Sequence, residues 1–334
     1  MLRFLSRSEV DAVAWDACVA VSSQRIVYGY SWYLAAVLLR PDWNGRDART
    51  GGPAFRWVGL VLPDDTGGYR AVMPVPLRQK FGTWVVHQPL FCQMLGVFSR
   101  DPALDPTPFY QAVYERFRYG SVIHFNQYPS PVVPFDIVRQ LTTHTLNLSI
   151  GYEAIYEHYT PDRRRNLRVA QAARWTVVDS TDPEPLLRLF GGNHAGQIDG
   201  GVGAWAYVIL RDLYNALKTR NLIVLRYAVL NGKTEAGALF VREGNRIIYL
   251  FNAASEAGRR GNARTLLIDQ IIREQAGRGD ADLPMLLDFE SPEKESVRAF
   301  YESFGGVTEP FWSARWNRLT MIERAGVWLL QRLG

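Results

Sequence analysis

A short segment rich in glycine and arginine is the part of this chain best suited to bind an anion. The sequence from Tyr249 to Ala263, YLFNAASEAGRRGNA, ends in small residues and a Gly-Arg-Arg-Gly stretch, and an apolar-patterned helix follows at 264–276. A loop before a helix presents unpaired backbone N–H groups and the positive end of the helix dipole to one point. The sequence therefore predicts a phosphate-binding loop made of Gly258, Arg259, Arg260, Gly261, Asn262 and Ala263.

Two acidic residues close the next predicted strand, at 285–289, and are candidates for proton transfer and substrate binding. Glu290 follows the strand and is predicted to act as a general base towards an ammonium acceptor. Asp288 lies two residues earlier, so it is predicted to share the strand face and to contact the substrate. Paired acids raise each other's pKa, which favours a basic role near neutral pH. The alternative is that either acid caps the next helix or pairs with an arginine.

Tyr301 lies on a predicted helix at 297–304 and is a candidate for a functional position. Its phenol has an ordinary pKa near 10. Phe300 and Phe304 stand four residues apart and are predicted to face the core, which turns Tyr301 by about 100° towards a polar surface. The alternative is an ordinary core tyrosine that packs beside the two phenylalanines.

A basic helix is predicted from Thr160 to Ala173. Its start carries a hydroxyl N-cap, a proline at the first helical position and an acid in the first turn. Arg164 and Arg168 lie four residues apart on one face, and they are predicted to bind a phosphate or carboxylate of the substrate. The alternative is a solvated arginine face.

The remaining elements predict an α/β chain of mixed, largely antiparallel sheets flanked by helices. With 334 residues the chain is long enough for two domains of about 150 residues, and we expect them at 1–150 and 151–334. Further helices are predicted at 9–21, 32–39, 107–119, 183–194, 204–219 and 321–333, and strands at 55–62, 69–76, 83–86, 121–125, 142–150, 177–179, 222–230, 235–242, 246–251 and 311–319.

Composition excludes several classes of protein. The net charge of +5 is too mild to indicate nucleic-acid binding by itself. The five histidines and two cysteines show no metal-ligand spacing, so no metal is expected. No run approaches the ~18 apolar residues of a membrane span. A cytoplasmic protein is the simplest expectation, and its oligomeric state is not predicted.

Five motifs give the chain a resemblance to a known superfamily. PVPLRQKFG at 74–82, RRRNLRVA at 163–170, the GRRGNA segment, LLDFES at 286–291 and FYESFGG at 300–306 occur in the order found in the FemABX-like branch of the GNAT acyltransferases. The resemblance implies two GNAT-like lobes. It also implies transfer of an acyl or aminoacyl group from a thioester or ester to an amine or hydroxyl held between the lobes.

Two departures from the family pattern concern the donor. Gly258 stands where GNAT enzymes favour Gln or Arg before their pyrophosphate loop, whereas Gly261 and Ala263 match. Tyr301 resembles the GNAT tyrosine that protonates the thiolate, and it occupies the place of a lysine common in peptidoglycan-bridge aminoacyl transferases. The resemblance therefore favours acyl-CoA, such as acetyl-CoA, as the donor.

Three hypotheses follow from these residues. The first is an acyltransferase that uses acyl-CoA and a small-molecule or peptide-like acceptor. The basic helix would suit an anionic acceptor. The second is a FemABX-type ligase of a peptidoglycan precursor that uses aminoacyl-tRNA. The third is a catalytically silent GNAT-like binding module.

Overall fold

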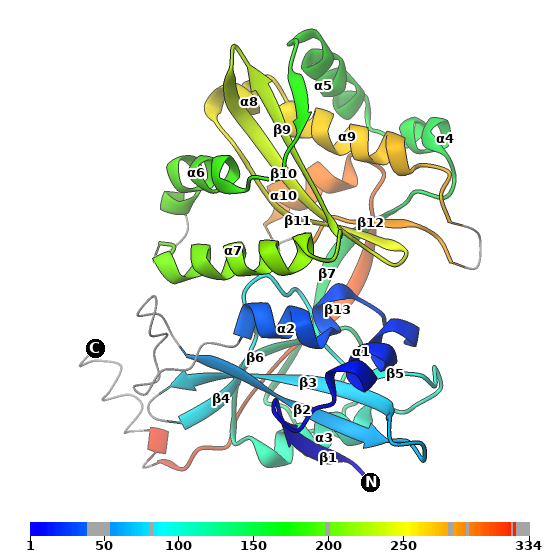
Figure 1. Ribbon diagram of the computed structural model, residues 1–334, viewed down its shortest axis with the longest axis vertical. Helices are drawn as coiled ribbons and strands as arrows, with labels where there is room; N and C mark the ends of the chain where they lie inside the picture. The colour runs from blue at the N-terminus through cyan, green and yellow to red at the C-terminus, as the bar shows by residue number, and fades with distance from the viewer. Residues whose placement is uncertain are drawn as a thin grey trace. The chain divides into compact units, whose positions relative to one another are not determined.

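The computed structural model describes residues 1–38, 54–80, 83–197, 201–279, 283–291, 294–321 and 323–324. The chain forms two compact units (Figure 1). Unit 1 comprises Met1–Leu141, Ala204–Leu213 and Pro310–Gly334, and unit 2 comprises Thr142–Gly203 and Tyr214–Glu309. The unit boundaries fall inside β7 (Ile137–Asn147), α7 (Ala204–Lys218) and β13 (Val307–Asn317). The division into domains after residue 150 stays a prediction.

Unit 1 is built around one mixed sheet in the order β1-β2-β3-β4-β6-β13. Neighbouring strands are antiparallel except β4 and β6, which are parallel. Helix α1 covers one face, because Trp15 packs on Trp57 and Gly59 of β2. Helix α3 shares a core with the opposite face. The bounds are β1 Arg3–Ser6, α1 Ala12–Val21, α2 Ser31–Leu38, β2 Phe55–Pro63, β3 Tyr69–Lys80, β4 Thr83–His87, β5 Phe98–Ser99, α3 Thr107–Arg116 and β6 Tyr119–Phe125.

Unit 2 repeats this architecture, with the strand order β8-β9-β10-β11-β12-β7. Here too one pair, β11 and β12, is parallel and the other neighbours are antiparallel. Helix α9 packs on the sheet beside α5 (Figure 1). The bounds are α4 Tyr152–Glu157, α5 Pro161–Ala172, β8 Thr176–Asp179, α6 Glu184–Asn193, β9 Ile223–Leu230, β10 Lys233–Glu243, β11 Arg246–Ala254, α8 Glu256–Arg260, α9 Ala263–Gln275, β12 Leu286–Asp288 and α10 Glu295–Glu302.

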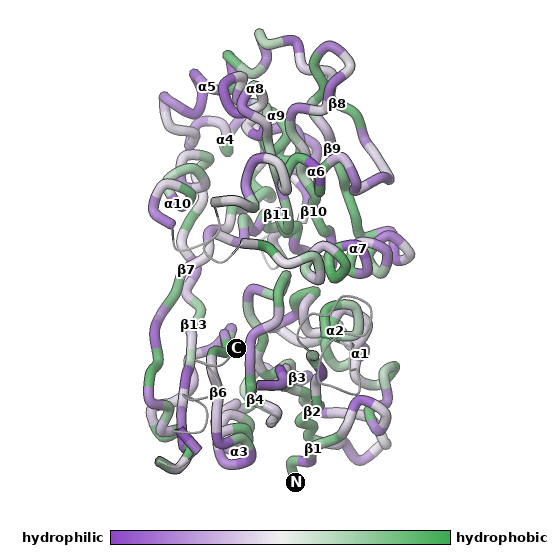
Figure 2. The backbone as a smooth tube through the Cα atoms, turned by 90° about the vertical axis from the view of Figure 1, so that its left-hand side faces the viewer, coloured by the Kyte–Doolittle hydropathy of each residue, from purple (hydrophilic) through white to green (hydrophobic). Residues whose placement is uncertain are grey.

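The predicted α/β class with mixed, largely antiparallel sheets is confirmed in both units. In Figure 2 the strands β10 and β11 are largely hydrophobic, as buried strands should be, whereas α5 is hydrophilic over most of its length. The predicted start of α5 is also confirmed, because the Thr160 side chain accepts a hydrogen bond from the Arg163 N–H at 3.2 Å. Among the described residues, none of the helices has the length and apolar character that crossing a bilayer requires.

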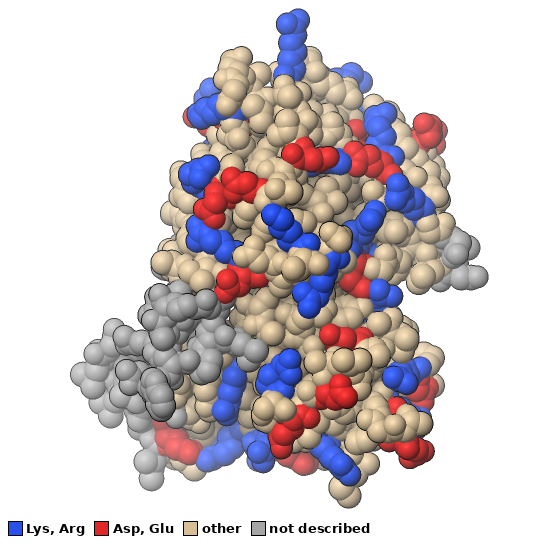
Figure 3. Space-filling view, viewed as in Figure 1, with Lys and Arg blue, Asp and Glu red and all other residues tan. Residues whose placement is uncertain are grey.

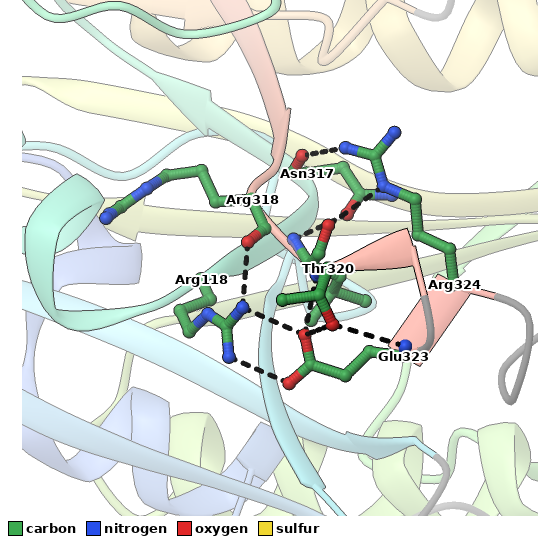
Figure 4. Close-up of polar contacts among 7 residues, drawn as sticks. Arg118, Asn317, Arg318, Thr320, Glu323 and Arg324 are labelled. Carbon is green, nitrogen blue, oxygen red and sulfur yellow. Dashed lines mark hydrogen bonds and ion pairs between the residues drawn. The ribbon is translucent and has the colours of Figure 1, made fainter.

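The segment after β13 is held to unit 1 by a polar cluster (Figure 4). Arg118 forms a bidentate ion pair with Glu323, with N–O distances of 2.7 and 2.8 Å. Its guanidinium also donates to the main-chain carbonyl of Arg318 at 3.1 Å. Thr320 donates its N–H and hydroxyl to the Glu323 carboxylate. The predicted C-terminal helix at 321–333 lies mostly outside the described residues.

Candidate functional site

The segment predicted as an open phosphate-binding loop is a short helix, α8, followed directly by α9. Ser255 caps α8, because its hydroxyl accepts from the Gly258 N–H at 3.0 Å. The N–H groups of Gly261 and Asn262 donate to main-chain carbonyls inside the segment, at 2.9 and 3.1 Å. The prediction of a loop of unpaired amides is therefore wrong. The cause is local: a serine N-cap and an acid in the first turn favour a helical turn despite the glycines.

The two glycines serve close packing. A Cβ at Gly258 would lie 2.1 Å from the main-chain oxygen of Glu235 on β10, and one at Gly261 would lie 2.4 Å from the Trp175 ring. Arg259 donates to the carbonyl of Ala254 at 2.9 Å, and the exposed Arg260 pairs with Glu256 one turn earlier. Phosphate binding by Gly258 to Ala263 stays a prediction, and it now rests on the start of α9.

Gly258→Ala should lower the free energy of unfolding by about 3 kcal/mol, because the added methyl meets a strand backbone that cannot yield cheaply. Gly192→Ala in α6 is the matched control. Nothing lies within 4 Å of its Cβ position, so this change should stabilise by up to about 0.5 kcal/mol. Denaturant unfolding of both variants checks the pair, and equal stability would contradict the close contact at Gly258.

The start of α9 presents a positive charge next to the end of β11. Asn262 adopts a left-handed φ of 51° and makes no side-chain cap. Arg264, in the first turn, donates to the Asn252 side-chain oxygen at 3.0 Å. Arg264 and Asn252 are both half-buried. Helix dipole and guanidinium therefore add at one place, which is a favourable position for an anion.

Tyr301 lies in the aromatic core of unit 2 and not on the polar surface that we predicted. Its side chain is 5% exposed, and its ring stacks on Phe289 with the centroids 4.7 Å apart. Phe304 is fully buried, whereas Phe300 is half-buried. The predicted orientation is wrong because Tyr301 lies at the centre of the apolar stripe of α10 and Phe300 at its edge.

The hydroxyl of Tyr301 nevertheless reaches a polar environment at its tip. Burial is the largest effect on Tyr301 and raises its pKa, which reaches about 12. The Glu290 carboxylate also raises this pKa, whereas the Arg264 charge and a hydrogen bond with Asn252 lower it. The hydroxyl therefore lies beside one amide, one cation and one carboxylate.

Glu290 and Asp288 lie in different environments. Glu290 has a φ of 47°, which breaks the strand alternation, and it is half-buried near Tyr301. Asp288 is fully buried and pairs with Arg246 at 2.7 Å. It also accepts from the Thr143 hydroxyl at 3.0 Å and from the Glu290 N–H at 2.9 Å. The structure thus makes Asp288 the partner of an arginine, which was the alternative to the predicted acid pair, and its contact with the substrate stays a prediction.

The basic helix α5 turns a different arginine inward from those predicted to bind substrate. Arg164 is half-buried and Arg168 is exposed, so their role stays a prediction. Arg163 is 5% exposed, and it donates to the hydroxyls of Ser303 at 2.8 Å and Thr265 at 2.6 Å. It also lies 4.2 Å over the Phe300 ring. Desolvation lowers the pKa of Arg163 to about 10, so it stays charged at neutral pH.

Four polar residues around Tyr301 or Arg264 were missed from the sequence. Arg163 could have been found, because it lies four and seven residues before the inward-facing Leu167 and Ala170. The other three carry no sequence signal and are brought together by the fold: Asn252, Arg264 and His194. The His194 ring nitrogen lies 3.2 Å from the Ala254 nitrogen, and the pKa of His194 is lowered by burial and by Arg264. In the part of the chain that the structure describes, no group of His, Cys, Asp or Glu could hold a metal ion.

Comparisons with known proteins define the class of fold. Residues 160–290 match the family model of the GNAT acetyltransferase domain, which supports a transferase. The chain is similar to FemX, with a TM-score of 0.59 and 13% identity, over 95% of this chain and 98% of that one. It is also similar to a tandem GNAT protein from the clavulanic acid biosynthesis pathway, with a TM-score of 0.51 and 13% identity, over 94% and 98% of the two chains.

A third similar structure is a conserved protein of unknown function from Bacteroides thetaiotaomicron, with a TM-score of 0.54, 12% identity, and coverage of 95% and 100%. No curated protein sequence matches the chain. At these identities the likeness concerns the fold. The chain therefore has a double-GNAT fold of the FemABX-like kind, as its motifs predicted.

Proposed function

We propose that this protein is an acyltransferase that moves an acyl group from acyl-CoA to an amine or hydroxyl acceptor. The observation that carries the proposal is the position of the Tyr301 hydroxyl. It lies beside the Asn252 amide and within electrostatic reach of the Arg264 cation and the Glu290 carboxylate. An acid that keeps its proton and a neighbouring carboxylate are the two groups that acyl transfer requires.

The proposed step uses one proton donor and one proton acceptor. The acceptor nitrogen or oxygen attacks the thioester carbonyl carbon, and the carbon–sulfur bond breaks. The departing thiolate takes the proton of the Tyr301 hydroxyl, while Glu290 removes the proton released by the acceptor. That proton returns to the phenolate through Glu290 or solvent, so the cycle is balanced. The protein contributes chiefly by holding donor and acceptor together.

The start of α9 is the proposed place for the donor phosphates. The helix dipole, Arg264 and the half-buried amide of Asn252 all favour an anion there. Arg163 makes hydrogen bonds to α9 and α10 and contacts Phe300, the residue before Tyr301. We assign it a positioning role. Because acyl-CoA is a cytoplasmic metabolite, the proposal places the reaction in the cytoplasm.

Titration calorimetry with acetyl-CoA and free CoA tests the donor. Wild-type protein should bind both, and Arg264→Gln should weaken binding at least about tenfold, the loss expected for one charge-assisted contact. The matched control is Arg242→Gln, an exposed arginine of β10 that pairs with Ile247 near the opposite end of β11. It should change the affinity less than about twofold. No heat from either ligand would overturn the acyl-CoA assignment and leave the tRNA-dependent ligase and the silent binding module.

A tRNA-dependent ligase is the second candidate, favoured by the outward-facing arginines of α5. Arg168 is exposed, and the exposed Arg165 pairs with Asp162 at 3.2 Å. On the face shown in Figure 3, however, basic and acidic side chains alternate and form no continuous basic track. Under this candidate, the chain binds aminoacyl-tRNA with a steep salt dependence and ignores acetyl-CoA.

A further inference from the structure

A second group of basic side chains gathers on one face of the unit 1 sheet, within a motif that acyl transfer in unit 2 does not use. Arg78 and Lys80 lie two residues apart near the end of β3, so they share a face. Arg78 pairs with Val85 of β4, which places His87, two residues further, on that same face. The Arg78 guanidinium lies 3.5 Å from the His87 Nε2.

This group contains no acid. Among the described residues, no carboxylate forms an ion pair with any of the three side chains. The charges that shift the pKa values of Lys80 and His87 are those of Arg78 and Lys80. Two other arginines of unit 1 behave differently. Arg70 pairs with Asp101 at 2.7 Å, and Arg118 pairs with Glu323 at 2.7 Å. Two uncompensated cations at one place are unfavourable unless an anion joins them.

The charges are also partly removed from water. Desolvation lowers the pKa of Arg78, and desolvation together with the Arg78 charge lowers that of Lys80. The Arg78 Nε is buried and has no hydrogen-bond partner in the described part of the chain. The guanidinium lies 5.7 Å over the Phe55 ring, which packs against Trp205. A bound anion would offset a desolvation cost that the fold has already incurred.

His87 holds the Arg78 guanidinium by accepting from it and does not bind the anion itself. Burial, Lys80 and Arg78 lower the pKa of His87 to about 4, so the ring is neutral at pH 7. Its Nδ1 lies 2.7 Å from the Ser121 hydroxyl, which in turn donates to the Val86 carbonyl at 3.2 Å. The histidine therefore donates from Nδ1 and presents Nε2 beside Arg78.

We propose that Arg78 and Lys80, with His87 holding the Arg78 guanidinium, form a binding site for a phosphoryl group in unit 1, in addition to the acyl-transfer residues of unit 2. A phosphate dianion matches two fixed positive charges, whereas a carboxylate neutralises one of them. The planar fork of Arg78 suits two phosphate oxygens, and Lys80 supplies a point charge. Phe55 beside the guanidinium gives the phosphate carrier an apolar contact.

Calorimetry on the full chain tests this site with inorganic phosphate, pyrophosphate and acetate as probes. We use the Arg264→Gln background, so that any phosphate bound at α9 does not contribute. Pyrophosphate should bind, and Arg78→Gln should weaken it at least about tenfold and Lys80→Gln about three- to tenfold. Tighter binding of pyrophosphate than of phosphate would identify a diphosphate carrier, and equal binding a single phosphoryl group.

Arg56→Gln is the matched control. Arg56 pairs with Leu77, so it lies on the opposite face of the same sheet, where it stacks 4.0 Å over Trp84. Its loss should change affinity less than about twofold, although it removes the same charge. Three results would overturn the proposal: no binding of either phosphate probe, equal losses in all three variants, or acetate binding as tight as phosphate. If Arg78→Gln fails to fold, Lys80→Gln decides. Loss of acetyl-CoA binding alone leaves this site intact, so the two proposals fail separately.

Discussion

Tyr301→Phe should reduce turnover by a factor of about 10² to 10³ and leave the affinity for the acyl donor within about twofold. The change removes the proton that the departing thiolate needs, and general acid catalysis contributes factors of this size. The ring stack on Phe289 is kept, so the fold should not change. Steady-state kinetics and donor titration on the same preparation separate the two effects. Turnover equal to wild type would remove the assigned role.

Tyr249→Phe is the control for this experiment. Tyr249 lies in the same aromatic core, 6.1 Å from the Tyr301 ring, and is 2% exposed. Its hydroxyl has no hydrogen-bond partner. Removing an unsatisfied buried hydroxyl should leave turnover unchanged and should not lower stability; a gain of up to about 1 kcal/mol is expected. A loss of turnover here would show that the core, and not the Tyr301 proton, controls the rate.

The pH dependence follows from the same environment. Because burial raises the pKa of Tyr301 to about 12, the acid keeps its proton throughout the neutral and mildly basic range. Tyrosine in the unfolded chain ionises near pH 10. The unfolded state therefore loses its proton first, and the contribution of Tyr301 to the free energy of unfolding should fall as pH rises from about 10 to 12. A rate decline near pH 9 that Tyr301→Phe abolishes would contradict this pKa.

Local patterns predicted the elements well because their causes are local. The start of α5 depends on Thr160 and Pro161, and the strands depend on apolar runs that the turns interrupt. The helical turn at 256–260 was missed because Gly258 and Gly261 usually indicate a loop. Their real requirement is the close approach of Glu235 and Trp175, which are tertiary contacts. No local pattern contains that information.

The site was predicted in part for the same reason. Tyr301 and Glu290 were found from residue type and position, and the structure brings them within electrostatic reach of each other. The residues that define their environment come from distant parts of the chain. Asn252 lies near the end of β11 and Arg264 near the start of α9, and Arg163 lies 138 positions before Tyr301. Which arginine of the run Arg163–Arg165 faces inward follows from helix phase. The pairing of Asp288 with Arg246 could be found only from the fold.

Arg163→Met should lower the free energy of unfolding by about 2 kcal/mol. Two hydrogen bonds from a charged donor and the contacts with Phe300 and Phe304 are lost, and relief of the desolvation cost offsets part of the loss. Arg165→Met is the control. Its side chain is 69% exposed, so its change should stay within about 0.5 kcal/mol. Equal stability of the two variants would show that the buried guanidinium contributes nothing.

The same substitution tests whether Arg163 positions the catalytic group. Arg163 holds Ser303 and Phe300 of α10, and Tyr301 follows Phe300 in the chain. Its loss should displace the phenol and cost about tenfold in turnover, measured where the variant is fully folded. If the effect passes through Tyr301, then adding Arg163→Met to Tyr301→Phe should cost less than about twofold more, because the displaced proton is already absent. Additive losses would mean that Arg163 acts on the substrate directly, and the positioning role would have to be abandoned.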